Sequence, residues 1–172
     1  MLHSGRVFDF TRENVTLGNG VTVDMEVIRH PGAAAIVPLT AAGDIVMLRQ
    51  YRHAVGGSLW EIPAGTMDPE DTSPLDCARR ELVEETGLRA AAWDELGELT
   101  PVPGYSDERI HLYLARELSP AVQNLDADEI VDVHTLPLVQ VRQMVFDGQI
   151  CDAKTIAGLF MIEKHVGMVV DP

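Results

Sequence analysis

The first 30 residues alternate between apolar and polar side chains with a period of two, which is the pattern of half-buried strands. Strands are predicted at residues 6–10, 15–17 and 21–27, and a Gly-Asn-Gly turn at residues 18–20 joins the last two into a hairpin. A hairpin of this size buries little apolar surface by itself. We therefore expect it to pack on the main domain or on a second subunit.

Apolar positions between residues 33 and 62 come in short runs, which favour buried strands. Small and branched side chains predict a strand at residues 33–39, a turn follows at 41–44, and residues 45–50 form the returning strand. Residues 59–62 predict a further short strand, which Pro63 ends.

The clearest helix signal follows at Ser73. This serine is a natural N-cap, Pro74 suits the first helical position, and Asp76 is placed to bond back to the cap. Gly87 predicts the end of the helix, because a left-handed residue commonly terminates one. One stripe of the helix is apolar and predicts its buried side: Leu75, Ala78 and Leu82.

The rest of the chain predicts strands and then helices. Strands are expected around residues 94–99, 109–116 and 130–136, and helices at 138–146 and 153–166, with Asp152 as the cap of the last. In the middle strand, Ile110, Leu112 and Leu114 face one way while His111 and Tyr113 face the other. The mixed order predicts an α/β fold in which helices cover both faces of a sheet.

Composition narrows the class of protein. The chain has 172 residues, of which 46% are hydrophobic and 23% charged, as in a globular protein of one main domain. The longest apolar run, residues 33–39, is far shorter than the roughly 20 residues of a membrane span. A net charge of −14 disfavours a general nucleic-acid binder.

Cellular location is predicted from two further features. No secretion signal opens the chain, and its two cysteines have neither metal-ligand nor disulfide-framework spacing, so a cytoplasmic protein is expected. The high negative charge also means that an anionic substrate would need cations recruited at its site.

Three carboxylates of the predicted helix share one side: Glu81, Glu84 and Glu85. They repel one another, and they lie in the C-terminal half, where the helix dipole disfavours anions. Two explanations are open. The side is either a solvated acidic face that Arg79 and Arg80 offset, or a cage of oxygen ligands for a hard cation such as Mg²⁺.

Residues 65–88 resemble the Nudix box of the Nudix hydrolases. The second half of the box matches at seven positions: Arg80, Glu81, Leu82, Glu84, Glu85, Gly87 and Leu88. The first half departs from the family pattern, because one extra residue separates Gly65 from Arg80 and the acidic position falls on Asp71, beside Glu70. A one-residue insertion in the turn before the helix costs little.

The resemblance extends beyond the box. Residues 49–52, 59–65, 103–108 and 126–133 are similar to the ADP-ribose pyrophosphatase branch of the family. This implies a Nudix fold, a mixed β-sheet sandwiched between α-helices, with residues 1–30 as a hairpin extension and residues 31–172 as the Nudix hydrolase domain. It also implies a homodimer in which the hairpin is exchanged and both subunits line the site.

The resemblance further implies roles for individual residues. Direct ligands of Mg²⁺, or of Mn²⁺ as the alternative ion, would be the Ala64 carbonyl, Glu81 and Glu85. Glu84 would act in catalysis through bound water or as a further ligand, and Arg80 would hold the glutamates in place. The general base would come from an acidic loop after the box, with Glu129 preferred and Asp126 and Asp128 as alternatives to it.

Three residues are expected to bind substrate. Arg52 can bond two phosphate oxygens, unless it serves only as an ion-pair partner of Glu61. The loop with Gly104 and Glu108 would approach the terminal ribose, Gly104 through close backbone contact and Glu108 through sugar hydroxyls. Trp60 is expected to pack rather than to stack on a base.

The resemblance implies that the activity is Mg²⁺-dependent cleavage of ADP-ribose, a small-molecule nucleoside diphosphate sugar, to AMP and ribose 5-phosphate. An alternative is hydrolysis of another nucleoside diphosphate sugar, such as GDP-mannose. A third hypothesis is a non-catalytic ligand sensor with the Nudix fold. Such modules typically lose glutamates of the box, whereas Glu81, Glu84 and Glu85 are all present here.

Overall fold

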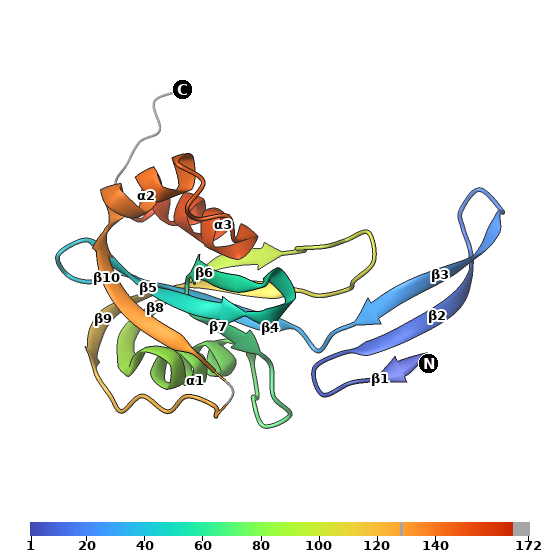
Figure 1. Cartoon of the computed structure of the whole chain (residues 1–172), viewed down its shortest axis with the longest axis horizontal. Coiled ribbons are helices and arrows are strands. Elements are labelled where there is room, and N and C mark those ends of the chain that lie inside the picture. Colours follow the sequence, from blue (N-terminus) through green and yellow to red (C-terminus); the bar gives the residue numbers. More distant parts are fainter. Residues whose placement is uncertain (128, 167–172) are drawn as a thin grey trace.

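Two β-sheets form the centre of the molecule, and helices cover them on both sides, as Figure 1 shows. The computed structural model describes residues 1–127 and 129–166. The four-stranded sheet has the order β7 (Ala64–Thr66), β4 (Ala33–Pro38), β9 (Ile110–Pro120) and β8 (Leu88–Leu99). Strands β4 and β9 are parallel and the other neighbours antiparallel. The predicted mixed sheet between helices is therefore confirmed, in two parts.

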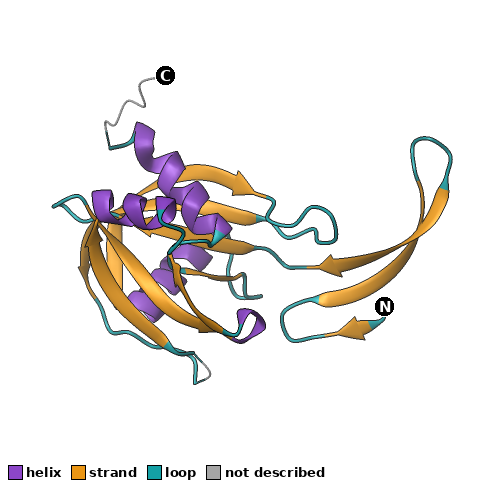
Figure 2. Cartoon of the chain, turned by 45° about the horizontal axis from the view of Figure 1, so that its top comes forward, coloured by secondary structure: helices purple, strands orange, loops and turns teal. Residues whose placement is uncertain are grey.

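The second central sheet is antiparallel, with the order β10 (Val131–Pro137), β5 (Asp44–Arg52) and β6 (Gly57–Glu61). A short 3₁₀ helix, His53–Val55, joins β5 to β6. Three α-helices complete the fold: α1 (Pro74–Thr86), α2 (Leu138–Phe146) and α3 (Ala153–Met161). Figure 2 shows α1 on one side of the sheets and α2 with α3 on the other.

Strand β4 divides the core because every one of its residues is buried. Ala34 and Ile36 face α1, in a cluster with Leu82 and Tyr113. Alternate residues such as Val37 face the opposite way, in a cluster that includes Val141 of α2 and Leu159 of α3. One side of β9 belongs to this second cluster, as predicted: Ile110, Leu112 and Leu114. A strand that is buried on both faces has a continuous run of apolar residues, and this run predicts the strand at residues 33–39.

A separate three-stranded sheet forms an arm at the N-terminus (Figure 1), with the order β1 (His3–Ser4), β2 (Asp9–Thr16) and β3 (Thr22–Arg29). The predicted hairpin turn is confirmed, since the Leu17 N–H donates to the Val21 carbonyl at 2.9 Å. The predicted strand at residues 6–10 is confirmed only at Asp9 and Phe10, which begin β2. Residues 5–8 form a tight turn, which the Gly5 N–H closes on the Phe8 carbonyl at 3.0 Å.

The arm is attached to the loop before β9 by several contacts. The Ile28 N–H donates to the Tyr105 carbonyl at 2.8 Å, and the Asp107 N–H donates to the Ile28 carbonyl at 3.2 Å. Arg29 pairs with Glu13 at 2.6 Å and with Asp107 at 3.0 Å. These contacts set the direction in which the arm leaves the body.

Other element boundaries differ by a few residues from prediction. Strand β8 begins at Leu88 rather than near residue 94, and β7 is a short strand that was not predicted. Helix α3 ends at Met161 and continues as the 3₁₀ turn Ile162–Lys164. Within the described part of the chain, none of the helices has the length and hydrophobicity to cross a bilayer.

Candidate active site

Helix α1 is positioned by the caps that the sequence predicted. Its first turn is closed by Ser73, whose side chain accepts from the Asp76 N–H at 3.2 Å and donates to the Asp76 carboxylate at 2.9 Å. Gly87 ends the helix in the left-handed conformation with φ 67°, and its N–H donates to the Val83 carbonyl. Because both ends and the apolar stripe are fixed, so is the direction of the remaining side.

Two of the three helical glutamates face inward, against β7. Glu81 is 8% exposed and Glu85 only 1%. The Ala64 N–H donates to Oε2 of Glu85 at 2.8 Å. Gly65 lies directly under the carboxylate of Glu81, since a Cβ at this position would stand 1.9 Å from Oε1. Only glycine leaves room for that carboxylate.

Burial disfavours the ionised form of these two carboxylates. Desolvation raises the pKa of Glu81 to about 7, although Arg80 acts in the opposite direction. Desolvation also raises the pKa of Glu85 to about 8, with a further contribution from the charge of Glu81. The negative charge of Glu129 contributes to raising both pKa values as well. The cluster therefore concentrates negative charge in a poorly solvated place.

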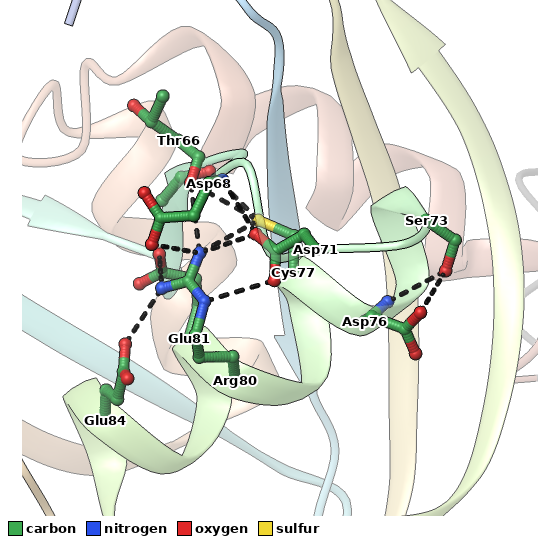
Figure 3. A network of polar contacts seen from close by, with 10 residues as sticks. Thr66, Asp68, Asp71, Ser73, Asp76, Cys77, Arg80, Glu81 and Glu84 are labelled. Carbon is green, nitrogen blue, oxygen red and sulfur yellow. Dashed lines mark hydrogen bonds and ion pairs between the residues drawn. The ribbon is translucent and has the colours of Figure 1, made fainter.

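Within the box, Arg80 connects helix α1 to the turn that precedes the helix, as the dashed lines in Figure 3 show. Its Nη1 lies 2.6 Å from Glu81 Oε1 and 2.9 Å from Glu84 Oε2. Its Nη2 lies 2.9 Å from Asp71 Oδ2 and donates to the Thr66 carbonyl at 3.1 Å. Despite the inserted residue, Asp71 thus reaches Arg80, and the hydrogen bond from Arg80 holds the pKa of Asp71 below its usual range.

A pocket of about 900 Å³ opens over this cluster. Its wall draws on segments far apart in the chain. It includes six of the residues predicted to act here: Arg52, Ala64, Glu81, Glu84, Glu108 and Glu129. Asp126 lines it too, whereas Asp128 lies outside the described residues. Glu85 lies beneath the wall, almost fully buried.

One predicted site residue lies elsewhere. Gly104 is exposed, an added Cβ there would meet nothing within 4 Å, and it does not belong to the described wall of the pocket. Its proposed contact with ribose stays a prediction. Trp60 contacts His134 edge-on, lies under Arg49 and packs against the core, which confirms the expected packing.

Comparison with known proteins agrees with this geometry. The sequence model of the NUDIX domain matches residues 29–159, which is most of the chain. The chain belongs to the Nudix family. A relative named ADP-ribose pyrophosphatase, from Mycobacterium tuberculosis, is 39% identical over 165 residues, covering 94% of this chain and 79% of that protein. A relative named methanol dehydrogenase activator, from Bacillus methanolicus, is 40% identical over 157 residues, covering 90% and 84%.

Two further similarities concern substrate and fold. A relative named GDP-mannose pyrophosphatase, from Cronobacter sakazakii, is 32% identical over 166 residues, covering 84% of this chain and 86% of that protein. A crystal structure titled ADP compounds hydrolase superposes with a TM-score of 0.83 at 24% identity, covering 98% of this chain and 92% of that one. This last similarity shows that the two share a fold.

The Nudix box of this chain has the chemistry of a divalent-cation site. Nudix hydrolases use divalent metal ions, and the buried carboxylates of Glu81 and Glu85 supply oxygen donors that lack sufficient positive charge around them. The described residues contain no group of three or more acidic, His or Cys side chains already gathered around one point. In the same place, Arg80 Nη1 bonds oxygens of Glu81 and Glu84, as Figure 3 shows.

Several residues of this Nudix pocket were not predicted from sequence. Among them are Arg6 of the arm, Asn124 of the acidic loop, and Lys154 at the start of α3. The cap at Asp152 predicted where α3 begins and is confirmed, since Asp152 accepts from the Thr155 N–H at 3.0 Å. No local pattern indicates that this helix start faces the pocket.

Proposed function

We propose that this Nudix protein hydrolyses the diphosphate of ADP-ribose to AMP and ribose 5-phosphate, with Mg²⁺ as the preferred ion and Mn²⁺ as an alternative. The observation that carries the proposal is the pair of inward-facing carboxylates, Glu81 and Glu85, under a pocket large enough for a nucleotide sugar. The relative named ADP-ribose pyrophosphatase, which covers most of the chain, supports this choice of substrate.

Glu81, Glu85 and the Ala64 carbonyl would hold the ion, with Glu84 as a further or water-mediated ligand. When bound, the ion neutralises diphosphate oxygens, polarises phosphorus and lowers the pKa of water. Glu129, with its carboxylate at the pocket wall, would accept the proton of the attacking water. The new bond joins the water oxygen to phosphorus, and the bond to the bridging oxygen breaks.

The remaining site residues would bind the substrate. Arg52 would contact phosphate oxygens, and Glu108 would accept hydrogen bonds from ribose hydroxyls, since both line the pocket. Gly104 would act from the neighbouring loop.

The arm supports a homodimer. Residues 1–30 would form an extension that is exchanged between two subunits, and residues 31–172 the hydrolase domain. Several apolar side chains of the arm are exposed in the single chain, among them Val7, Phe8 and Met25. A second subunit would bury such a surface.

We also propose a cytoplasmic location. The two cysteines, Cys77 and Cys151, are free thiols, which agrees with a reducing compartment.

A substrate panel tests the proposal. Purified protein is incubated with Mg²⁺ and ADP-ribose, GDP-mannose or UDP-glucose, and kcat/KM is measured for each. ADP-ribose should give the highest value, with AMP and ribose 5-phosphate as products. The relative named GDP-mannose pyrophosphatase makes GDP-mannose the second candidate, and a higher value for that substrate would select it. No cleavage of any of the three with Mg²⁺ or Mn²⁺ would favour the non-catalytic sensor.

A further inference from the structure

A second buried charged cluster lines the same pocket, centred on Glu61 at the end of β6. Arg52 donates to this carboxylate through two nitrogens, Nε to Oε1 at 2.9 Å and Nη2 to Oε2 at 2.8 Å. Lys154 donates to Oε2 at 2.5 Å and lies 3.1 Å from a carboxylate oxygen of Asp152. Glu61 is 2% exposed and the Lys154 side chain 12%. One buried carboxylate therefore holds two cations side by side.

The start of α3 is tied to β6 by hydrogen bonds that fix Lys154 in this place. The Ile62 N–H donates to Thr155 Oγ1 at 2.9 Å. The hydroxyl and N–H of Thr155 both donate to Asp152, at 2.6 and 3.0 Å. This chain of contacts joins two segments that are 93 residues apart. Lys154 consequently reaches the pocket wall from a helix that otherwise packs on the core.

The stability of the fold does not explain this cluster. Burying several charges costs desolvation free energy that their mutual attraction often fails to recover. Although burial alone would raise the pKa of Glu61, the contacts with Arg52 and Lys154 lower it below its usual range, so the carboxylate stays ionised. Glu61 uses two of the five N–H donors of Arg52. Of its three N–H donors, Lys154 uses one in the hydrogen bond to Glu61 among the described contacts, and it also forms an ion pair with Asp152. Both cations therefore keep donors for another acceptor.

The rest of the pocket wall is acidic, so an anionic substrate needs the free donors of these two cations. Acidic side chains of several segments line it: Glu81, Glu84, Glu108, Asp126 and Glu129. A diphosphate entering such a pocket is repelled unless fixed cations meet it. Arg52 and Lys154 are two cations of that wall, and Glu61 sets the spacing between them.

We propose that Lys154 is a substrate-binding residue that, together with Arg52, bonds phosphate oxygens of the nucleoside diphosphate sugar, and that Glu61 is the positioning residue for both cations. The inference rests on the proposed function, because it names a further contact in the same pocket. Neither Lys154 nor Glu61 belongs to the Nudix box, so the inference does not depend on the identity of the metal ligands.

Lysine labelling tests the contact without any substitution. The chain has two lysines, Lys154 and Lys164, and Lys164 is exposed outside the pocket. The native protein is acetylated for short times with Mg²⁺ present, and each lysine is quantified by mass spectrometry. Inorganic pyrophosphate, AMP and ribose 5-phosphate are tested separately. At least one of them should slow acetylation of Lys154 fivefold or more while Lys164 is unaffected. Equal labelling of Lys154 with and without all three would overturn the proposal.

Two variants test the roles by kinetics. Lys154→Met should raise KM for the substrate at least tenfold while kcat changes less than threefold, and the matched control Lys164→Met should behave as wild type. Glu61→Gln keeps the side-chain shape but removes the charge that holds both cations, so it should also raise KM more than it lowers kcat. A residue with only a structural role would lower the amount of active protein and leave KM unchanged, and this result would contradict the assignment.

The two proposals fail separately. If ADP-ribose is cleaved and Lys154→Met leaves KM unchanged, the substrate contact is wrong and the proposed function stands. If ADP-ribose is not cleaved but pyrophosphate protects Lys154, the substrate is wrong and the phosphate contact stands.

Discussion

Glu85→Gln should make the metal-free protein more stable and nearly inactive at the same time. Glu85 is 1% exposed, and burial raises its pKa from 4.5 to about 8. The folded state therefore binds this proton more tightly than the unfolded state does. The contribution of this one group to stability is greatest below about pH 4.5, falls as the pH rises from there to about 8, and then levels off. Glutamine carries no charge and can still accept a hydrogen bond from the Ala64 N–H, so the variant should not lose this stability as the pH rises.

The size of the expected stabilisation follows from the pKa shift of Glu85 on folding. At pH 7 a carboxyl whose pKa rises from 4.5 to about 8 on folding costs about 3 kcal/mol. Because Glu81 contributes to the shift, part of this cost belongs to the pair, and a gain of about 1–3 kcal/mol is expected. For a chain of 172 residues this corresponds to a rise in Tm of roughly 2–12 °C.

The assay is urea unfolding in EDTA at pH 5 and pH 8, with Glu70→Gln, on the exposed turn before the helix, as the matched control. Glu85→Gln should exceed wild type at pH 8, with a much smaller difference at pH 5, while turnover with Mg²⁺ falls by at least a factor of about 100. A variant no more stable than wild type at pH 8 would refute the assigned burial of charge, and unchanged turnover would refute its part in catalysis.

Three further predictions concern other parts of the structure. Gly65→Ala should reduce kcat at least tenfold, because its Cβ would collide with Glu81. The control Gly18→Ala, in an open turn, should leave kcat unchanged, and equal kcat values for the two variants would contradict the prediction. Arg80→Lys should destabilise by about 1–3 kcal/mol in thermal unfolding, since one ammonium cannot serve Asp71, Glu81 and Glu84 together, and an unchanged Tm would contradict the role given to Arg80. Sedimentation should show a dimer of twice 18.8 kDa, and Met25→Asp on the arm should shift it toward monomer; a monomeric wild type would exclude the exchanged arm.

Helix α1 was predictable because its signals are local. Ser73, Asp76 and Gly87 specify both ends, and the apolar stripe specifies which side is buried. The box glutamates then follow from helical spacing. The box pattern does not show where Asp71 lies, because one residue is inserted before it, but the turn absorbs that residue and the Asp71 carboxylate still pairs with Arg80.

Contacts between distant segments could not be predicted in this way. Nothing near Lys154 indicates that it meets Glu61, because the pairing depends on where α3 docks against β6. The turn at residues 5–8 was mistaken for a strand because its apolar residues suit a strand, while the hydrogen bond from Gly5 to Phe8 decides otherwise. The resemblance predicts a ribose contact for Gly104, which stays a prediction, whereas the contact of the next residue, Tyr105, with Ile28 of the arm had no signal in the sequence.

We propose above that Glu81 and Glu85 hold a divalent cation at the floor of the pocket. Titration of the metal-free protein with Mn²⁺, followed by the electron paramagnetic resonance signal of the free ion, measures this directly. Wild type and Glu70→Gln should bind the ion with equal affinity, and Glu81→Gln and Glu85→Gln should each weaken binding at least tenfold. Equal affinity of all four proteins for Mn²⁺ would show that Glu81 and Glu85 do not hold the ion.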